Sequence, residues 1–175
     1  MKLHISDLWE DGGVVGWAAW PTHGSRVAEV KHDGVLLANR EDESMAVELA
    51  FAEVREMPRV LAVHERLHQD LQRHDADDAS LDRYPDPRVG PDGEVVSGVV
   101  RDASGMAMWF CCRLPSGLEV LIGRHAVMLT RGMTPELLAH FVERRRVPDS
   151  WLRLGLWDLE FVADIAAVLV ARGQP

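Results

Sequence analysis

The chain has 175 residues, 47% of them hydrophobic, so it is long enough to bury one sizeable core and too short for a second full domain. Its 28 acidic residues outnumber 19 basic ones, and this balance disfavours a nucleic-acid partner, because phosphate backbones are bound by clustered Lys and Arg. No stretch approaches the roughly 18 apolar residues that span a bilayer. The N-terminal stretch MKLHISDLWEDGG lacks the apolar core of a signal peptide. We therefore expect one cytoplasmic domain over residues 1–175, with no membrane partner.

The first forty residues are predicted to form a small antiparallel sheet. Apolar runs with partial alternation are typical of half-buried strands. His32, Asp33 and Gly34 separate two such runs, and Asp-Gly between apolar runs indicates a tight hairpin turn. The predicted strands are residues 2–9, 13–20, 26–30 and 34–38.

Two helices are predicted after residue 41. Pro58 is expected to end the first helix and to lie in the first turn of the second, where its missing N–H costs nothing. The second helix is expected to run to about His74. Apolar residues of the first helix, three to five positions apart, are Met45, Leu49, Ala52 and Met57.

The second of these helices carries an apolar stripe formed by Val60, Leu67 and Leu71. His64 fills the remaining position of the stripe, and His68 lies beside it. Two histidines are therefore expected on or near the buried side of the helix.

Residues 75–91, DADDASLDRYPDPRVGP, are rich in Asp and Pro and have neither helical nor strand periodicity. We interpret them as an acidic loop that separates the two halves of the chain.

The second half is predicted to open with a meander of strands and to end with helices. Thr134 and Pro135 are expected to cap and begin a helix that continues to about Arg146. A last helical region is expected from Trp151, interrupted near Gly155 and resuming over residues 158–172. The predicted strands are residues 94–101, 106–113, 118–122 and 125–130.

These elements predict an α+β fold with mostly antiparallel strands and about four helices in a single compact domain. One mixed sheet and two packed sheets are both compatible with the pattern. Cys111 and Cys112 are adjacent, so a disulfide between them would be strained, and we expect the reduced thiols of a cytoplasmic protein.

The stretch HERLH, residues 64–68, has a metal-binding pattern. On a helix, residues four apart share one side, so His64 and His68 would bind one zinc ion while Glu65 acts as general base on a bound water. The stretch resembles the HExxH signature of the zincin metalloproteases. The longer stretch HERLHQDLQRHD is similar to the metzincin form, which implies His74 as the third ligand. Metzincins have Gly at the position of Leu71, whereas Leu71 would continue the helix. A helix with solvated or hydrogen-bonded histidines is the alternative interpretation.

A second resemblance depends on the order of elements. Three opening strands, a helix bearing Glu48, and residues 59–63 as a strand would be similar to the layout of ribonuclease H, whose carboxylates hold two metal ions. The resemblance implies Asp7, Glu48 and Asp164 as those acids. It also departs from the family, because His64 stands where the third acid should follow the strand. A degenerate, inactive ribonuclease H-like scaffold is therefore what it implies.

Protein binding is the function that the sequence favours. No phosphate-loop, dinucleotide-binding or hydrolase-elbow motif is present. The acidic balance and the six tryptophans suit recognition of another protein with a basic surface. We expect a bacterial or phage protein of the inhibitor, immunity or accessory type, without a cofactor. Two alternatives stay open, namely a zinc-dependent hydrolase using Glu65 with His64, His68 and His74, and the ribonuclease H-like scaffold. The oligomeric state is left open.

Overall fold

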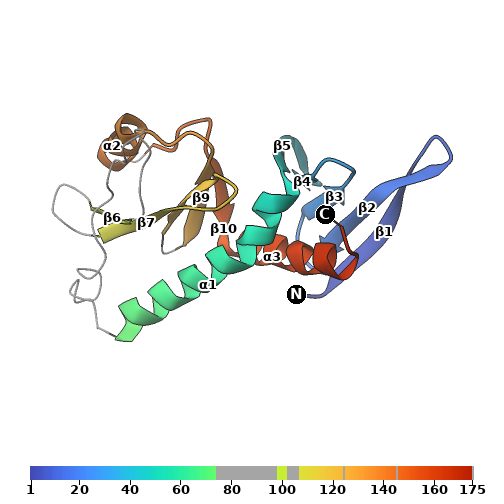
Figure 1. The fold of residues 1–175 in the computed structure, drawn as a ribbon, viewed down its shortest axis with the longest axis horizontal. Coiled ribbons are helices and arrows are strands. Elements are labelled where there is room, and N and C mark those ends of the chain that lie inside the picture. The colour runs from blue at the N-terminus through green and yellow to red at the C-terminus, as the bar shows by residue number, and fades with distance from the viewer. Residues whose placement is uncertain (74–97, 102–106, 124, 145, 175) are drawn as a thin grey trace. The chain divides into compact units, whose positions relative to one another are not determined.

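The computed structural model describes residues 1–73, 98–101, 107–123, 125–144 and 146–174 (Figure 1). Over these residues the chain forms two five-stranded antiparallel sheets and three helices. The α+β prediction is confirmed, with three helices described instead of about four. Chain contacts divide the molecule into two compact units, Met1–Pro58 with Trp157–Pro175, and Arg59–Leu156.

The first unit contains a sheet in which each strand pairs with its neighbour in sequence. Its order is β1-β2-β3-β4-β5, so β1 and β5 are the edges. The strand prediction for the first forty residues is confirmed. The strands are β1 (Leu3–Glu10), β2 (Gly13–Pro21), β3 (Arg26–Val30), β4 (Val35–Asn39) and β5 (Asp42–Leu49).

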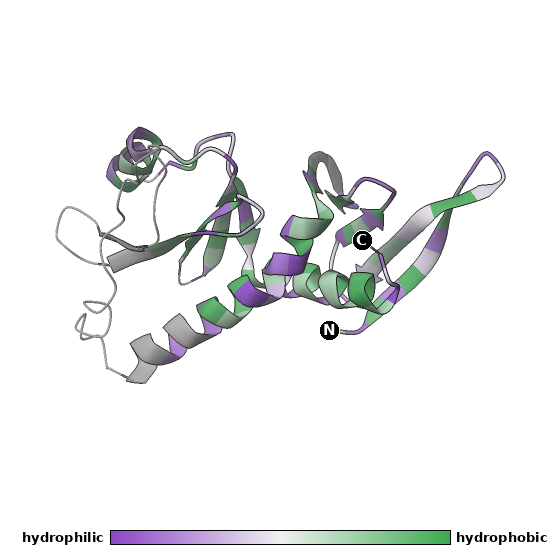
Figure 2. Ribbon diagram, in the orientation of Figure 1, coloured by the Kyte–Doolittle hydropathy of each residue, from purple (hydrophilic) through white to green (hydrophobic). Residues whose placement is uncertain are grey.

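One face of this first sheet is apolar and is covered by α3 (Leu156–Ala171), whose ribbon is mainly green in Figure 2. The Trp17 indole N–H donates a hydrogen bond to Oε1 of Gln174, just beyond the helix, at 2.7 Å. Arg26 forms a two-point ion pair with Asp158 at 2.9 and 3.1 Å. Cross-strand neighbours on the buried face are Trp17, Val30, Val35 and Leu49 in one row, and Ala19, Ala28 and Leu37 in the next.

The segment that follows β4 is a strand, which corrects the prediction of a helix from residue 41. Asn39 pairs with Asp42 in a short hairpin, and its side-chain oxygen accepts the N–H of Glu41 at 3.0 Å. Such an Asn side-chain turn reverses the chain locally. The segment then pairs with β4 as a strand, although the spacing of its apolar residues also fits a helix. The spacing of residues within a segment carries no information about whether another strand lies beside it.

The helix α1 (Phe51–Arg73) is continuous and contains Pro58 in its interior, so the prediction that Pro58 separates two helices is wrong. Its start is fixed by Glu53, whose carboxylate accepts the N–H of Ala50 at 2.8 Å, as in the reciprocal half of a capping box. Buried Met57 and Val60 lie on either side of the proline. Their burial offsets the hydrogen bond that Pro58 cannot donate.

The second unit contains a sheet of order β10-β9-β8-β7-β6. The helix α2 (Pro135–Arg144) begins as predicted, with Thr134 Oγ1 accepting the N–H of Leu137 at 3.2 Å. The strands of this second sheet are β6 (Gly98–Arg101), β7 (Ala107–Arg113), β8 (Glu119–Ile122), β9 (Ala126–Thr130) and β10 (Leu152–Gly155). A buried cluster joins sheet and helix and comprises Cys111, Leu121, Met128, Met133, Leu138, Phe141 and Trp151.

β10 corrects the prediction of a helical region beginning at Trp151. Residues 152–155 pair with 126–129 of β9, a partner more than twenty positions earlier in the chain. The apolar periodicity within residues 151–157 is too short to separate a strand from a helix. α3 then occupies most of the predicted range 158–172.

In the part of the chain that the structure describes, no helix combines the length and the apolar character needed to cross a membrane. The predicted acidic loop, residues 75–91, lies outside the described residues.

Candidate functional site

The HERLH stretch lies on α1, as predicted, with both histidines on the same side of the helix. The rings of His64 and His68 are nearly parallel, with 6.1 Å between their centroids and 10° between their planes. His64 is buried, with 7% of its surface exposed, while His68 is partly buried and Glu65 is exposed. The spacing therefore places two imidazoles together and leaves the carboxylate open to solvent.

The third zinc ligand is not identified by the structure. His74, predicted for that role, lies outside the described residues. α1 continues through Leu71 to Arg73, nine residues and about 13 Å along the axis from His64. The helix thus lacks the sharp turn at Leu71 that the metzincin pattern requires. Among the described residues, no group of three His, Cys, Asp or Glu side chains is arranged to hold a metal ion. The set of Glu65, His64, His68 and His74 stays a prediction.

The acids of the ribonuclease H resemblance do not come together. Asp7 lies on β1 and Glu48 on β5, at opposite edges of the first sheet and four strand spacings, or about 19 Å, apart. Asp164 lies on α3, with its carboxylate 2.8 Å from the terminal amine of Met1. Five strands precede the first helix, and residues 59–63 are helical. The layout on which this resemblance depended is therefore absent from the described chain.

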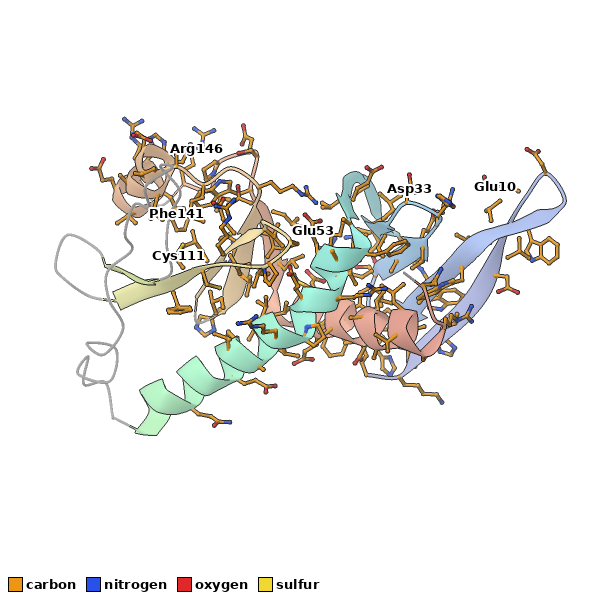
Figure 3. The ribbon with its side chains drawn as sticks, in the orientation of Figure 1. Glu10, Asp33, Glu53, Cys111, Phe141 and Arg146 are labelled. Atoms are coloured by element: carbon orange, nitrogen blue, oxygen red, sulfur yellow. The ribbon has the colours of Figure 1, made fainter. Side chains whose placement is uncertain are left out.

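Both thiols are poor candidates for a nucleophile. Burial raises the pKa of the Cys111 thiol to about 12 and that of Cys112 to about 11. Cys111 packs its sulfur 3.5 Å from that of Met133, inside the cluster that also holds Phe141 (Figure 3). A nucleophilic cysteine needs a lowered pKa and access to substrate, so neither thiol is suited to that role, and Cys111 packs in the core.

A different candidate site emerges at the hairpin formed by β1 and β2. β2 pairs with β3 only over Trp17, Ala18 and Ala19, so the half of the hairpin nearer its turn extends past β3. Large apolar side chains are exposed there and along β1. We define the hairpin surface by Ile5, Trp9, Val14 and Val15, together with the acidic residues Asp7, Glu10 and Asp11.

Local sequence explains the shape of this hairpin. Asp11 and Gly12 have φ of 49° and 81°, the backbone that a two-residue type I′ turn requires. Leu8 pairs with Gly16 but Trp9 pairs with Val14, so Val15 is an extra residue that forms a bulge. Turn and bulge together shape a twisted two-stranded ribbon behind the hydrophilic tip (Figure 2).

Trp9 is the tryptophan of the hairpin surface and has 66% of its surface open to solvent. Trp157, at the start of α3, is 50% exposed. Exposed tryptophan is costly to leave in water and is enriched where proteins bind one another. The sequence indicated that its six tryptophans suit recognition of another protein, and exposure separates Trp9 and Trp157 from buried Trp17 and Trp151.

The hairpin surface is negatively charged. Glu10, labelled at the hairpin in Figure 3, accepts a hydrogen bond from Lys31 at 2.7 Å. That carboxylate raises the pKa of the Lys31 amine. Asp7 and Asp11 are exposed and take part in no ion pair found among the described residues. Apolar side chains with acidic neighbours are suited to contact an apolar patch with basic neighbours.

Comparison with protein-family models, with curated proteins and with solved structures found no match to this chain.

Proposed function

We propose that the protein acts by binding another protein that presents a basic surface, with the hairpin surface as the contact. The observation that carries the proposal is the exposure of Trp9 on the β1–β2 hairpin, with Val14 as its cross-strand neighbour. A tryptophan held by a hairpin loses little conformational freedom on binding, so its burial contributes most of its apolar area to affinity.

Charge supports the same proposal. The chain carries a net charge of -9, and three acids lie within or beside the hairpin turn and β1. Complementary charge speeds encounter with a basic partner and disfavours acidic ones, nucleic acids included. An inhibitor, immunity or accessory factor of a bacterial or phage system fits this chemistry. Free Cys111 and Cys112 suit a reducing cytoplasm.

The proposal is tested by immobilising the wild-type protein and the Trp9→Ala variant and comparing the proteins that each one retains. Trp157→Ala is the matched control, because it removes the other exposed tryptophan and leaves the hairpin intact. We expect a partner with a basic surface whose Kd rises at least tenfold with Trp9→Ala and changes little with Trp157→Ala. Binding should weaken as salt is added. Retention that does not depend on Trp9 would contradict the proposal.

A zinc-dependent hydrolase is the second candidate, favoured by the parallel rings of His64 and His68 on one side of α1. His64 and His68 would hold the metal, which would activate a water, and exposed Glu65 would serve as the base for its proton. A zinc site without catalytic activity would use the same two histidines.

Elemental analysis of protein purified without a His-tag separates these candidates. A hydrolase should carry about one equivalent of zinc. The variant His68→Ala should lose the zinc, whereas Glu65→Gln should keep the zinc and lose hydrolysis. His68 is used because it is less buried than His64, so its removal disturbs packing less. Metal-free wild-type protein would end the hydrolase candidate and leave protein binding unaffected.

A further inference from the structure

We propose that β1 binds an extended segment of the partner protein as an additional strand of the first sheet. The segment carries an apolar, a basic and an apolar residue at alternate positions. This inference depends on the proposed function of protein binding and specifies its mode.

The free edge of β1 supplies the backbone groups for such binding. β1 is eight residues long, lies at the edge of the sheet, and pairs within the described chain with β2 alone. Every second residue of an edge strand directs its N–H and C=O away from the sheet. Natural edges are commonly protected by Lys, Pro, bulges, inward-pointing charges or short strands. Leu3–Glu10 contains neither Lys nor Pro, and its inward-pointing charge, Asp7 opposite Trp17, disfavours apolar or acidic strands while it admits a basic one.

The side chains of β1 specify what the added strand should carry. Ile5, Asp7 and Trp9 occupy alternate positions and therefore share one face of the strand, and all three are exposed. An added strand places its own alternate side chains about 5 Å from these. Apolar residues opposite Ile5 and Trp9, with Arg or Lys opposite Asp7, complete three favourable cross-strand pairs.

A second copy of the chain suits this edge less well. In antiparallel pairing of two β1 strands, the register that brings Ile5 against Trp9 also sets Asp7 directly opposite Asp7 of the other copy. Two carboxylates facing each other across strands destabilise the pairing. Each copy also carries a net charge of -9. Charge therefore favours a basic partner segment over self-association.

Binding of synthetic peptides to the full chain tests the inference. The probe is a capped peptide of about eight residues, matched to the length of β1, with valine, arginine and valine at alternate central positions and threonine elsewhere. A second peptide has glutamate in place of the arginine. A third has N-methyl groups on alternate amides, which removes backbone donors while side chains are kept. We expect the arginine peptide to bind, and the other two to bind at least tenfold more weakly.

Reversing the charge of a side chain on β1 tests whether Asp7 recognises the arginine of the peptide. Asp7→Arg should weaken binding of the arginine peptide about tenfold and strengthen binding of the glutamate peptide. Glu41→Arg is the matched control, since Glu41 is an exposed acid in the turn between β4 and β5, at the opposite side of the sheet from β1. It should leave the preference for the arginine peptide unchanged. Equal effects of the two variants would overturn the assignment of Asp7.

Amide hydrogen exchange distinguishes strand addition from side-chain docking. The arginine peptide should slow exchange of alternate amides within residues 3–10. Three results would overturn the inference: absence of binding, equal binding of the N-methylated peptide, or protection of these amides by dimerisation without peptide. If partner retention still requires Trp9 in those cases, strand addition is wrong and the proposed protein-binding function stands.

Discussion

Glu119 is a carboxylate buried at the start of β8, where only 5% of its surface is exposed. Its Oε2 accepts the N–H of Met133 at 2.6 Å, which satisfies a buried backbone donor in the loop before α2. Glu119→Leu should lower the free energy of unfolding by about 2–3 kcal/mol, because it leaves that donor without a partner. Glu119→Gln keeps an acceptor oxygen and should cost about 1 kcal/mol. Urea denaturation measures both, and equal losses would show that the hydrogen bond is unimportant.

The buried thiols make stability depend on alkaline pH. Burial raises the pKa of Cys111 to about 12 and of Cys112 to about 11, above the ordinary value of 9.0. The folded state therefore keeps these protons when the unfolded chain has lost them. This contribution to stability is complete below about pH 9 and is lost as pH rises through the folded values.

Urea unfolding at pH 8 and near pH 10.5 should show a fall of about 1–2 kcal/mol for each thiol. The variant Cys111→Ala with Cys112→Ala is the control and should show a smaller fall between the two pH values. Thiol-directed reagents should react slowly with buried Cys111 in the native protein and rapidly in urea. Rapid reaction of Cys111 at pH 8 without urea would contradict the burial argument.

Replacing Pro58 tests how the helix α1 tolerates a proline in its interior. It lies inside α1, where its ring removes the hydrogen bond to the carbonyl of Val54. Pro58→Ala restores the donor and should raise the free energy of unfolding by about 1–3 kcal/mol. Glu65→Ala, at an exposed position of the same helix, should change it by about 0.5 kcal/mol or less. Circular dichroism during urea unfolding reports both, and a loss of stability in Pro58→Ala would mean that α1 needs its proline geometry.

Local signals predicted most of the elements. Apolar runs and turn residues located β1 to β4 and β6 to β9, and the Thr-Pro pair located the start of α2. β5 and β10 were missed although apolar and polar residues alternate in both, as in Val47-Glu48-Leu49 and Leu152-Arg153-Leu154, because runs this short do not separate a strand from a helix. Pro58 misled for a different reason, since the packing around Met57 and Val60 that tolerates it is not local.

The candidate sites were predictable to different degrees. HERLH was placed correctly on a helix because i and i+4 spacing is a local property. The exposure of Trp9 was not predictable, because it depends on where β3 stops pairing with β2. The available signal was the position of Trp9 just before the Asp11-Gly12 turn, where a hairpin often extends beyond its sheet.

At the scale of the whole molecule, the first unit is assembled from both ends of the chain. Sheet residue Trp17 bonds Gln174, and Arg26 bonds Asp158, across more than one hundred positions. A chain truncated after Leu156 lacks this covering and should expose the apolar face of the first sheet. We expect increased binding of a hydrophobic dye and rapid proteolysis within residues 1–58.

The same truncation should leave the second unit largely protected, because its cluster around Phe141 and Trp151 lies within residues 59–156. Val170→Ala is the control for α3, since this side chain is exposed and should affect neither assay. Persistent protection of residues 1–58 after truncation would show that the first sheet folds without α3.

Synthesis of the chain imposes an order on these events. α3 leaves the ribosome about 100 residues after β5, a delay of roughly 5–20 s at about 5–20 residues per second. During that interval the face lined by Ala28 and Val30 lacks its covering helix, while the residues of the second unit emerge one after another. The second unit therefore completes its core first. The newly synthesised first sheet, with its apolar face uncovered, is the part of the chain that most needs a chaperone.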